Sequence, residues 1–167
     1  MNSHEQLLHR FYSAFQKKDH QEMASCYHPD VTFGDPAFPH LEGWKASAMW
    51  MMLCERGKDL ELEFRDISAD DTTGKAFWEA HYTFSKTGLK VHNKINAAFK
   101  FKDGLIIEHR DSFDMKKWMG MALGFKGKVL GLFPFGPQMV QKTAMGGLEQ
   151  FIEKRNLGPG DFPNGRD

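Results

Sequence analysis

Apolar residues recur every three to four positions in the first part of the chain. They do so in residues 3–17, 19–27 and 43–56, which predicts three helices. Ser3 and Gln6 have the spacing of a capping box for the first helix, and Gly57 stands where a helix C-cap belongs. Between the second and third helices, residues 31–33 alternate as in a short strand that ends in a turn. The N-terminal part is therefore mainly helical.

From residue 60 onward the apolar period changes to two. Residues 60–64, 76–85, 91–101 and 105–113 alternate between apolar and polar side chains, and turn signals such as Lys102-Asp103-Gly104 separate them. This pattern predicts an antiparallel meander. In the strand at 76–85, the alternation does not settle which face is inside: the one with Trp78 and Tyr82, or the one with Glu79 and His81.

The pattern becomes helical again after the strands. Asp114 is a candidate N-cap for a helix that four glycines weaken, and a last helix is expected over residues 138–156. We therefore predict a core at residues 1–114, a helical extension packed on it at 115–157, and a flexible tail at 158–167.

Charge and composition exclude several classes of protein. The 167 residues include 22 basic and 22 acidic side chains, so the formal net charge is zero, which argues against a nucleic-acid partner. Two cysteines do not make a disulfide framework. The N-terminus has no signal-peptide pattern, and the chain has no apolar run long enough to cross a membrane. We expect a cytoplasmic protein without a membrane partner.

Several phrases resemble the nuclear transport factor 2-like superfamily, which includes ketosteroid isomerases, SnoaL-like polyketide cyclases and limonene epoxide hydrolases. They are FYSAF, KKD, YHPDVTFGDP, HYTF and FKFKDGLIIEHRDSFD, within residues 5–114. The resemblance implies an α+β fold in which a curved antiparallel sheet forms a cone around the N-terminal helices, with extra C-terminal helices here. It also implies an apolar pocket and a homodimer formed through the outer sheet face. Because the superfamily contains enzymes and binding proteins, activity has to be argued from the pocket.

Asp35 is the first candidate catalytic residue. Its place in the Asp-Pro turn after the short strand resembles that of the general-base aspartate of ketosteroid isomerases. An aspartate before proline is also a common turn former, and both interpretations stay open. By the same resemblance, the two hydrogen-bond donors of the isomerase site fall on Phe11 and Ala97, which cannot donate. We therefore do not expect ordinary ketosteroid isomerisation.

His109 and Asp111 are the second candidate catalytic group. They are two residues apart on a strand, so they share a face, and Leu105, Ile107 and Phe113 suggest that it is the inner one. SnoaL-like cyclases have a similar aspartate late in the sheet with a histidine nearby, which implies Asp111 as acid or base and His109 as its partner. The alternative is a buried pair that fixes the strand register.

Other residues are candidates for ligand contact. We expect a small hydrophobic molecule to touch Tyr12, Phe15, Trp50, Asn93, Phe113 and Trp118. Residues 129–135 are expected to form a lid over the pocket, because they are short and lack a basic amphipathic face for a membrane. Neither a metal-ligand spacing nor a glycine-rich nucleotide loop is present in the sequence, so no metal and no cofactor are expected.

The sequence thus favours a cofactor-independent isomerase, cyclase or hydratase that acts on a small hydrophobic molecule by acid–base catalysis. A carrier for an apolar ligand and a protein-interaction module are the alternatives.

Overall fold

Short polar side chains begin the first two helices. In α1 (Ser3–Gln16), Asn2 Oδ1 accepts from the Glu5 N–H at 2.9 Å, and Glu5 Oε2 accepts from the Asn2 N–H at 3.1 Å. The capping box therefore lies one residue before the predicted Ser3 and Gln6. Asp19 caps α2 (His20–Ser25). This helix ends earlier than the sequence predicted, because Tyr27 already begins a strand.

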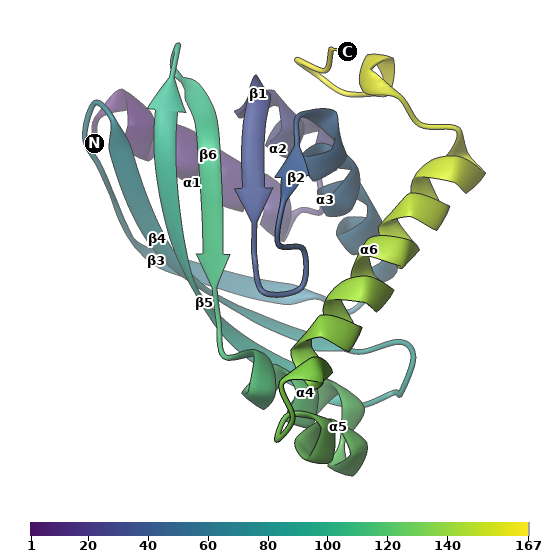
Figure 1. The fold of residues 1–167 in the computed structure, drawn as a ribbon. Coiled ribbons are helices and arrows are strands. Elements are labelled where there is room, and N and C mark those ends of the chain that lie inside the picture. Colours follow the sequence, from purple (N-terminus) through teal and green to yellow (C-terminus); the bar gives the residue numbers. More distant parts are fainter. Residues whose placement is uncertain (167) are drawn as a thin grey trace.

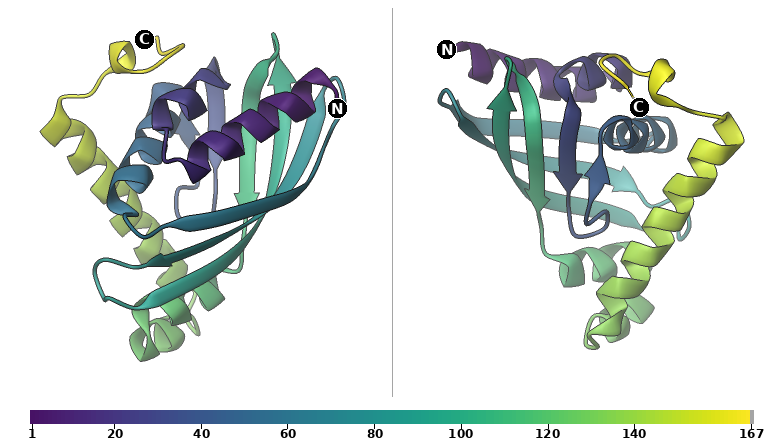
Figure 2. Two further views of the ribbon diagram at one scale, coloured as in Figure 1. Left: turned by 180° about the vertical axis from the view of Figure 1, so that it is seen from behind. Right: turned by 45° about the horizontal axis from the view of Figure 1, so that its top comes forward.

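The third helix has glycines at both ends. α3 (Trp44–Arg56) begins after Gly43, whose φ of 56° suits glycine, and Gly57 is its C-cap as predicted. Its buried side chains pack with those of α1 against the inner face of the sheet. The computed structural model describes residues 1–166, and Figures 1 and 2 show α1 lying along the curved sheet.

The sheet has six strands in the order β2-β1-β6-β5-β4-β3 and curves without closing (Figure 1). The predicted meander from β3 to β6 is confirmed, because each of these strands pairs antiparallel with the next. β1, however, pairs parallel with β6, whereas the sequence predicted an antiparallel sheet. The strands are β1 (Tyr27–Gly34), β2 (Leu41–Glu42), β3 (Glu61–Ala69), β4 (Thr73–Thr83), β5 (Lys90–Lys102) and β6 (Leu105–Ser112).

The structure settles which face of β4 is inside. Trp78 and Ala80 are buried in the core, whereas Glu79 lies on the outer face and pairs with Arg65 and His92. Apolar burial decides this orientation, because the inner face packs on α1 and α3.

A bulge in β6 changes which of its residues face inward. The register between β5 and β6 shifts between Lys100 and Phe101, so Ile106 is buried, whereas Leu105 and Ile107 are only half-buried. The grouping of those two residues with His109 and Asp111 was therefore wrong. The inward direction of the pair itself is nevertheless right, since both members are buried.

The C-terminal helices extend along one side of the cone (Figure 1). Gly124, with φ at 68°, divides the first predicted helix into α4 (Met115–Leu123) and α5 (Phe125–Leu130). α6 (Phe135–Arg155) follows and packs on α3, where Arg155 pairs with Glu55 at 2.6 Å.

The residues after α6 make specific contacts, although the sequence suggested a flexible tail. A short 3₁₀ turn (Pro159–Asp161) leads to Phe162, which is buried and stacks on Trp44 with ring centroids 6.0 Å apart. Asn164 Nδ2 donates to the carbonyl oxygen of Tyr27 at 3.2 Å. Within residues 1–166, no helix is long and apolar enough to cross a membrane.

Candidate functional site

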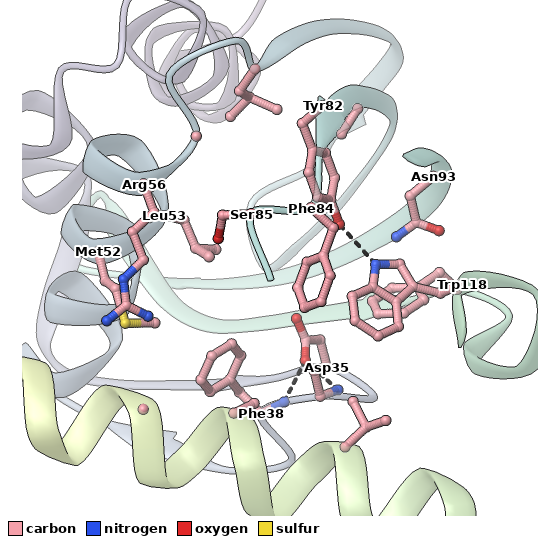
Figure 3. A pocket seen from close by; sticks show the side chains of 18 of the residues that line it. Asp35, Phe38, Met52, Leu53, Arg56, Tyr82, Phe84, Ser85, Asn93 and Trp118 are labelled. Atoms are coloured by element: carbon pink, nitrogen blue, oxygen red, sulfur yellow. Dashed lines mark hydrogen bonds between the residues drawn. The ribbon is translucent and has the colours of Figure 1, made fainter. Parts of the chain in front are cut away.

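A cavity of about 410 Å³ lies between α3, the inner face of the sheet and the C-terminal helices. Most of the side chains that line it are apolar, and Figure 3 shows many of them around the central space. The polar side chains among them that are buried or half-buried include Asp35, Tyr82, Asn93 and Asp111. Arg56, Lys86 and Thr143 also line it but are exposed, which places them at its rim.

Asp35 is held by the turn that follows β1. Its Oδ1 accepts from the Ala37 N–H at 2.7 Å and from the Phe38 N–H at 2.6 Å. Its Oδ2 has no hydrogen-bond partner among the described residues, and the side chain points into the cavity (Figure 3). The turn interpretation and the functional one are therefore compatible, because one carboxylate oxygen holds the turn while the other stays free.

The pKa of Asp35 is raised from 3.8 to about 7. Burial is the main cause, because it disfavours the charged form, and the negative charge of Asp111 adds to it. The N–H groups of Phe38 and Ala37 act in the opposite direction, since they stabilise the carboxylate. The carboxyl is thus close to half-ionised near neutral pH, as an acid–base group needs to be.

Tyr82 faces the same space from β4 and is not among the residues expected from the sequence. Its hydroxyl oxygen accepts from Trp118 Nε1–H at 2.7 Å, while its own O–H has no acceptor among residues 1–166. Burial raises its pKa, and the charge of Asp35 raises it further. A neutral hydroxyl with an unused proton therefore faces Asp35 across the cavity, as Figure 3 shows.

The alternation along β4 contained the signal for Tyr82. Tyr82 lies on the same face of β4 as Trp78 and Ala80, and it is the residue of that face that has a hydroxyl group. Phe11 and Ala97, the positions that match the donors of the isomerase site, are buried in the core, and their side chains have no group that can donate. Tyr82 supplies a donor from a different strand.

A chain of hydrogen bonds leads through the core to Asp111. Trp50 Nε1–H donates to Tyr27 Oη at 2.8 Å. The Tyr27 hydroxyl can then donate its own proton to His109 Nδ1 at 2.7 Å. His109 Nε2–H then donates to Asp111 Oδ1 at 2.9 Å. In this direction every proton has an acceptor, so the hydrogen-bond chain is satisfied with the His109 proton on Nε2.

This chain gives His109 and Asp111 different positions. Asp111 lines the cavity, whereas His109 is fully enclosed behind it among aromatic rings. His109 is thus placed to orient Asp111 rather than to touch a ligand. Tyr27 was missed because the sequence put it at the end of a helix.

Five of the six expected ligand contacts line the cavity: Phe15, Trp50, Asn93, Phe113 and Trp118. Tyr12 does not. It is enclosed in the core beside Phe64 and Phe99, and its hydroxyl has no hydrogen-bond partner within residues 1–166. The side-chain amide of Asn93 likewise has no protein partner there, but it opens into the cavity. In the same residues, no group of three His, Cys, Asp or Glu side chains could hold a metal ion.

The fold is similar to that of several solved structures. A candidate polyketide cyclase from Xanthomonas campestris is 21% identical, with a TM-score of 0.60 over 71% of this chain and 96% of that one. TerC, crystallised with polyporic acid, is 16% identical, with a TM-score of 0.62 over 72% and 98%. An LEH-like epoxide hydrolase from M. tuberculosis is 20% identical, with a TM-score of 0.57 over 78% of this chain and 92% of that one.

At these identities the neighbours establish the fold alone, a cone of the nuclear transport factor 2-like type. No curated protein matches the chain. The model of the SnoaL-like domain matches residues 8–109, which is more than half of the sequence and includes β1, the turn with Asp35, and His109. The chain therefore belongs to the SnoaL-like domain family.

Proposed function

We propose that the cavity binds a small hydrophobic carbonyl compound and that Asp35 transfers a proton to and from its carbon atoms. The observation that carries this proposal is the pairing of two groups across one apolar cavity. Asp35 presents a free Oδ2 with a pKa of about 7, and Tyr82 presents an unused O–H. One group can act as a base while the other stabilises negative charge.

The proposed step requires no cofactor. Ionised Asp35 removes a proton from the carbon next to the substrate carbonyl, and the electron pair of the broken C–H bond forms an enolate. Tyr82 donates its O–H to the enolate oxygen, where the negative charge develops. If the substrate has a C=C bond between its β- and γ-carbons, the enolate is a dienolate. The protonated Asp35 then returns the proton to the γ-carbon, and the double bond moves into conjugation with the carbonyl without net gain or loss of atoms.

The other polar groups would orient the substrate. The free amide of Asn93 can donate to a second oxygen, and Asp111 can accept from a substrate hydroxyl. In a substrate with a second carbonyl group, the enolate carbon could instead attack that carbonyl, and protonated Asp35 would give its proton to the alkoxide that forms, which is an aldol-type cyclisation. The fold neighbours are compatible with such ligands, since TerC was crystallised with polyporic acid and another neighbour is a candidate polyketide cyclase.

Deuterium exchange tests the proposal without knowledge of the natural substrate. 2-Tetralone is a bicyclic ketone with acidic hydrogens beside its carbonyl. In D₂O at neutral pH, the wild-type protein should accelerate their replacement by deuterium, measured by mass spectrometry. Asp35→Asn should abolish the acceleration because the amide is not a base. Tyr82→Phe should reduce it by about a hundredfold or more, the usual cost of losing one such donor.

A matched control is available in Asp66→Asn, which makes the same change at an exposed position on β3. It should exchange 2-tetralone as the wild type does. Binding of 2-tetralone without accelerated exchange, or exchange that persists in Asp35→Asn, would contradict the proposed chemistry. The former result would favour a carrier.

A further inference from the structure

Large apolar side chains are exposed at one end of the molecule. Phe125 is 80% exposed and Leu132 is 79% exposed, and Phe133, Phe135 and Met139 are each about half exposed. They belong to α5, to the loop after it and to the start of α6. Figures 1 and 2 show these segments at the end of the molecule farthest from α1. Large apolar side chains that are exposed together on neighbouring segments mark a contact surface.

The same segment has an unusual charge. Residues 115–148 contain Lys116, Lys117, Lys126, Lys128 and Lys142 but neither Asp nor Glu, although the whole chain has a formal net charge of zero. All five lysines are exposed, and none forms an ion pair within residues 1–166. Residues 129–135 by themselves lack a basic face, and for that reason a membrane contact was not expected from the sequence. The lysines that supply one come from α4, α5 and α6.

This surface is continuous with the rim of the cavity. Met139 is half exposed and also lines the cavity, as do Leu130 and Gly136 nearby. Phe125 and Leu132 do not line it, so neither is needed to close the cavity. The apolar side chains therefore lie where a hydrophobic molecule would enter or leave.

We propose that this apolar patch, together with the exposed lysines of α4, α5 and α6, docks on the surface of an anionic lipid membrane. The phenylalanine and leucine side chains would enter the interface between headgroups and acyl chains, and the lysines would bind the anionic headgroups. Docking in this orientation brings the rim of the cavity to the bilayer, so a hydrophobic ligand can pass between the two without crossing water. The transfer of a ligand between the bilayer and the cavity rests on the proposed function, whereas docking on the membrane does not.

The test is co-sedimentation with vesicles of phosphatidylcholine, with and without 30% phosphatidylglycerol. The wild type should sediment with the anionic vesicles, much less with pure phosphatidylcholine, and should be released by 0.5 M salt. Lys126→Glu with Lys128→Glu should weaken the binding by about 25-fold or more, because each lysine near an anionic surface contributes roughly fivefold. Phe125→Ser with Leu132→Ser should weaken it similarly through the lost apolar contact.

The control is Lys75→Glu with Lys94→Glu, which makes the same charge change on exposed residues of the sheet and should bind as the wild type does. Equal binding of the wild type and both patch variants, or no binding to anionic vesicles, would overturn the proposal. Light scattering adds a second check, because a dimer that only Phe125→Ser with Leu132→Ser dissociates would assign the patch to a second copy. All these variants should keep the exchange of 2-tetralone, so failure of docking and failure of the chemistry are distinguishable.

Discussion

The stability of the Asp35→Asn variant should depend on pH differently from that of the wild type. Asparagine has nearly the same shape as aspartate, and its carbonyl oxygen can still accept from the Ala37 and Phe38 N–H groups. The substitution removes the ionisable group and leaves the turn. It therefore isolates the free-energy cost of a charged carboxylate in this cavity.

The magnitude follows from the pKa of Asp35, which is 3.8 in a free chain and about 7 in the folded protein. Between pH 3.8 and about pH 7, Asp35 holds a proton in the folded state that it has lost in the unfolded state. The stabilisation is thus present at low pH and disappears as the pH rises through 7. Between pH 5 and pH 8 the wild type should lose about 2 to 3 kcal/mol of stability from this group, whereas Asp35→Asn should not.

Urea denaturation at pH 5, 6, 7 and 8 measures this effect. The difference in stability between the two proteins should grow in favour of Asp35→Asn, and most of the change should occur below pH 7. Other titrating groups are common to both proteins and cancel in the difference. Asp66→Asn should show no such trend, because Asp66 is exposed. A difference that stays constant from pH 5 to pH 8 would refute the reasoning that burial raises the pKa of Asp35.

Two further pairs of substitutions test the core and the extension. Tyr27→Phe should destabilise the protein by about 1 to 3 kcal/mol in urea denaturation, because it leaves two buried ring nitrogens without a partner, whereas Tyr12→Phe should be neutral or stabilising because its hydroxyl has none. Equal effects of the two would contradict the assigned chain of hydrogen bonds. Gly127→Ala should lower the melting temperature, because its Cβ would collide with the Met119 carbonyl of α4, whereas Gly146→Ala in α6 meets open space and should stabilise the helix by up to about 1 kcal/mol. If Gly127→Ala melts like the wild type, the close packing of α4 on α5 is wrong.

Much of the secondary structure could be predicted from the local sequence. The helix that ends at Arg56, the strands from β3 to β6 and the N-cap at Asp114 follow from spacing, alternation and capping, which depend on nearby residues. Errors occurred where a distant segment decides the outcome. Tyr27 begins a strand because β6 pairs with it, and the bulge near Ile107 follows from the pairing with β5.

The candidate site, too, was predicted from the sequence only in part. The sequence by itself determined the family type of the fold, and it selected Asp35, His109 and Asp111 as the ionisable groups of interest. Only the tertiary structure decided what each of them faces. It places Asp35 and Asp111 in the cavity, encloses His109 behind it, and brings Tyr82 from β4 opposite Asp35. Solvation, pKa and free hydrogen-bonding capacity depend on the neighbours that folding brings together, and these neighbours are far apart in the chain.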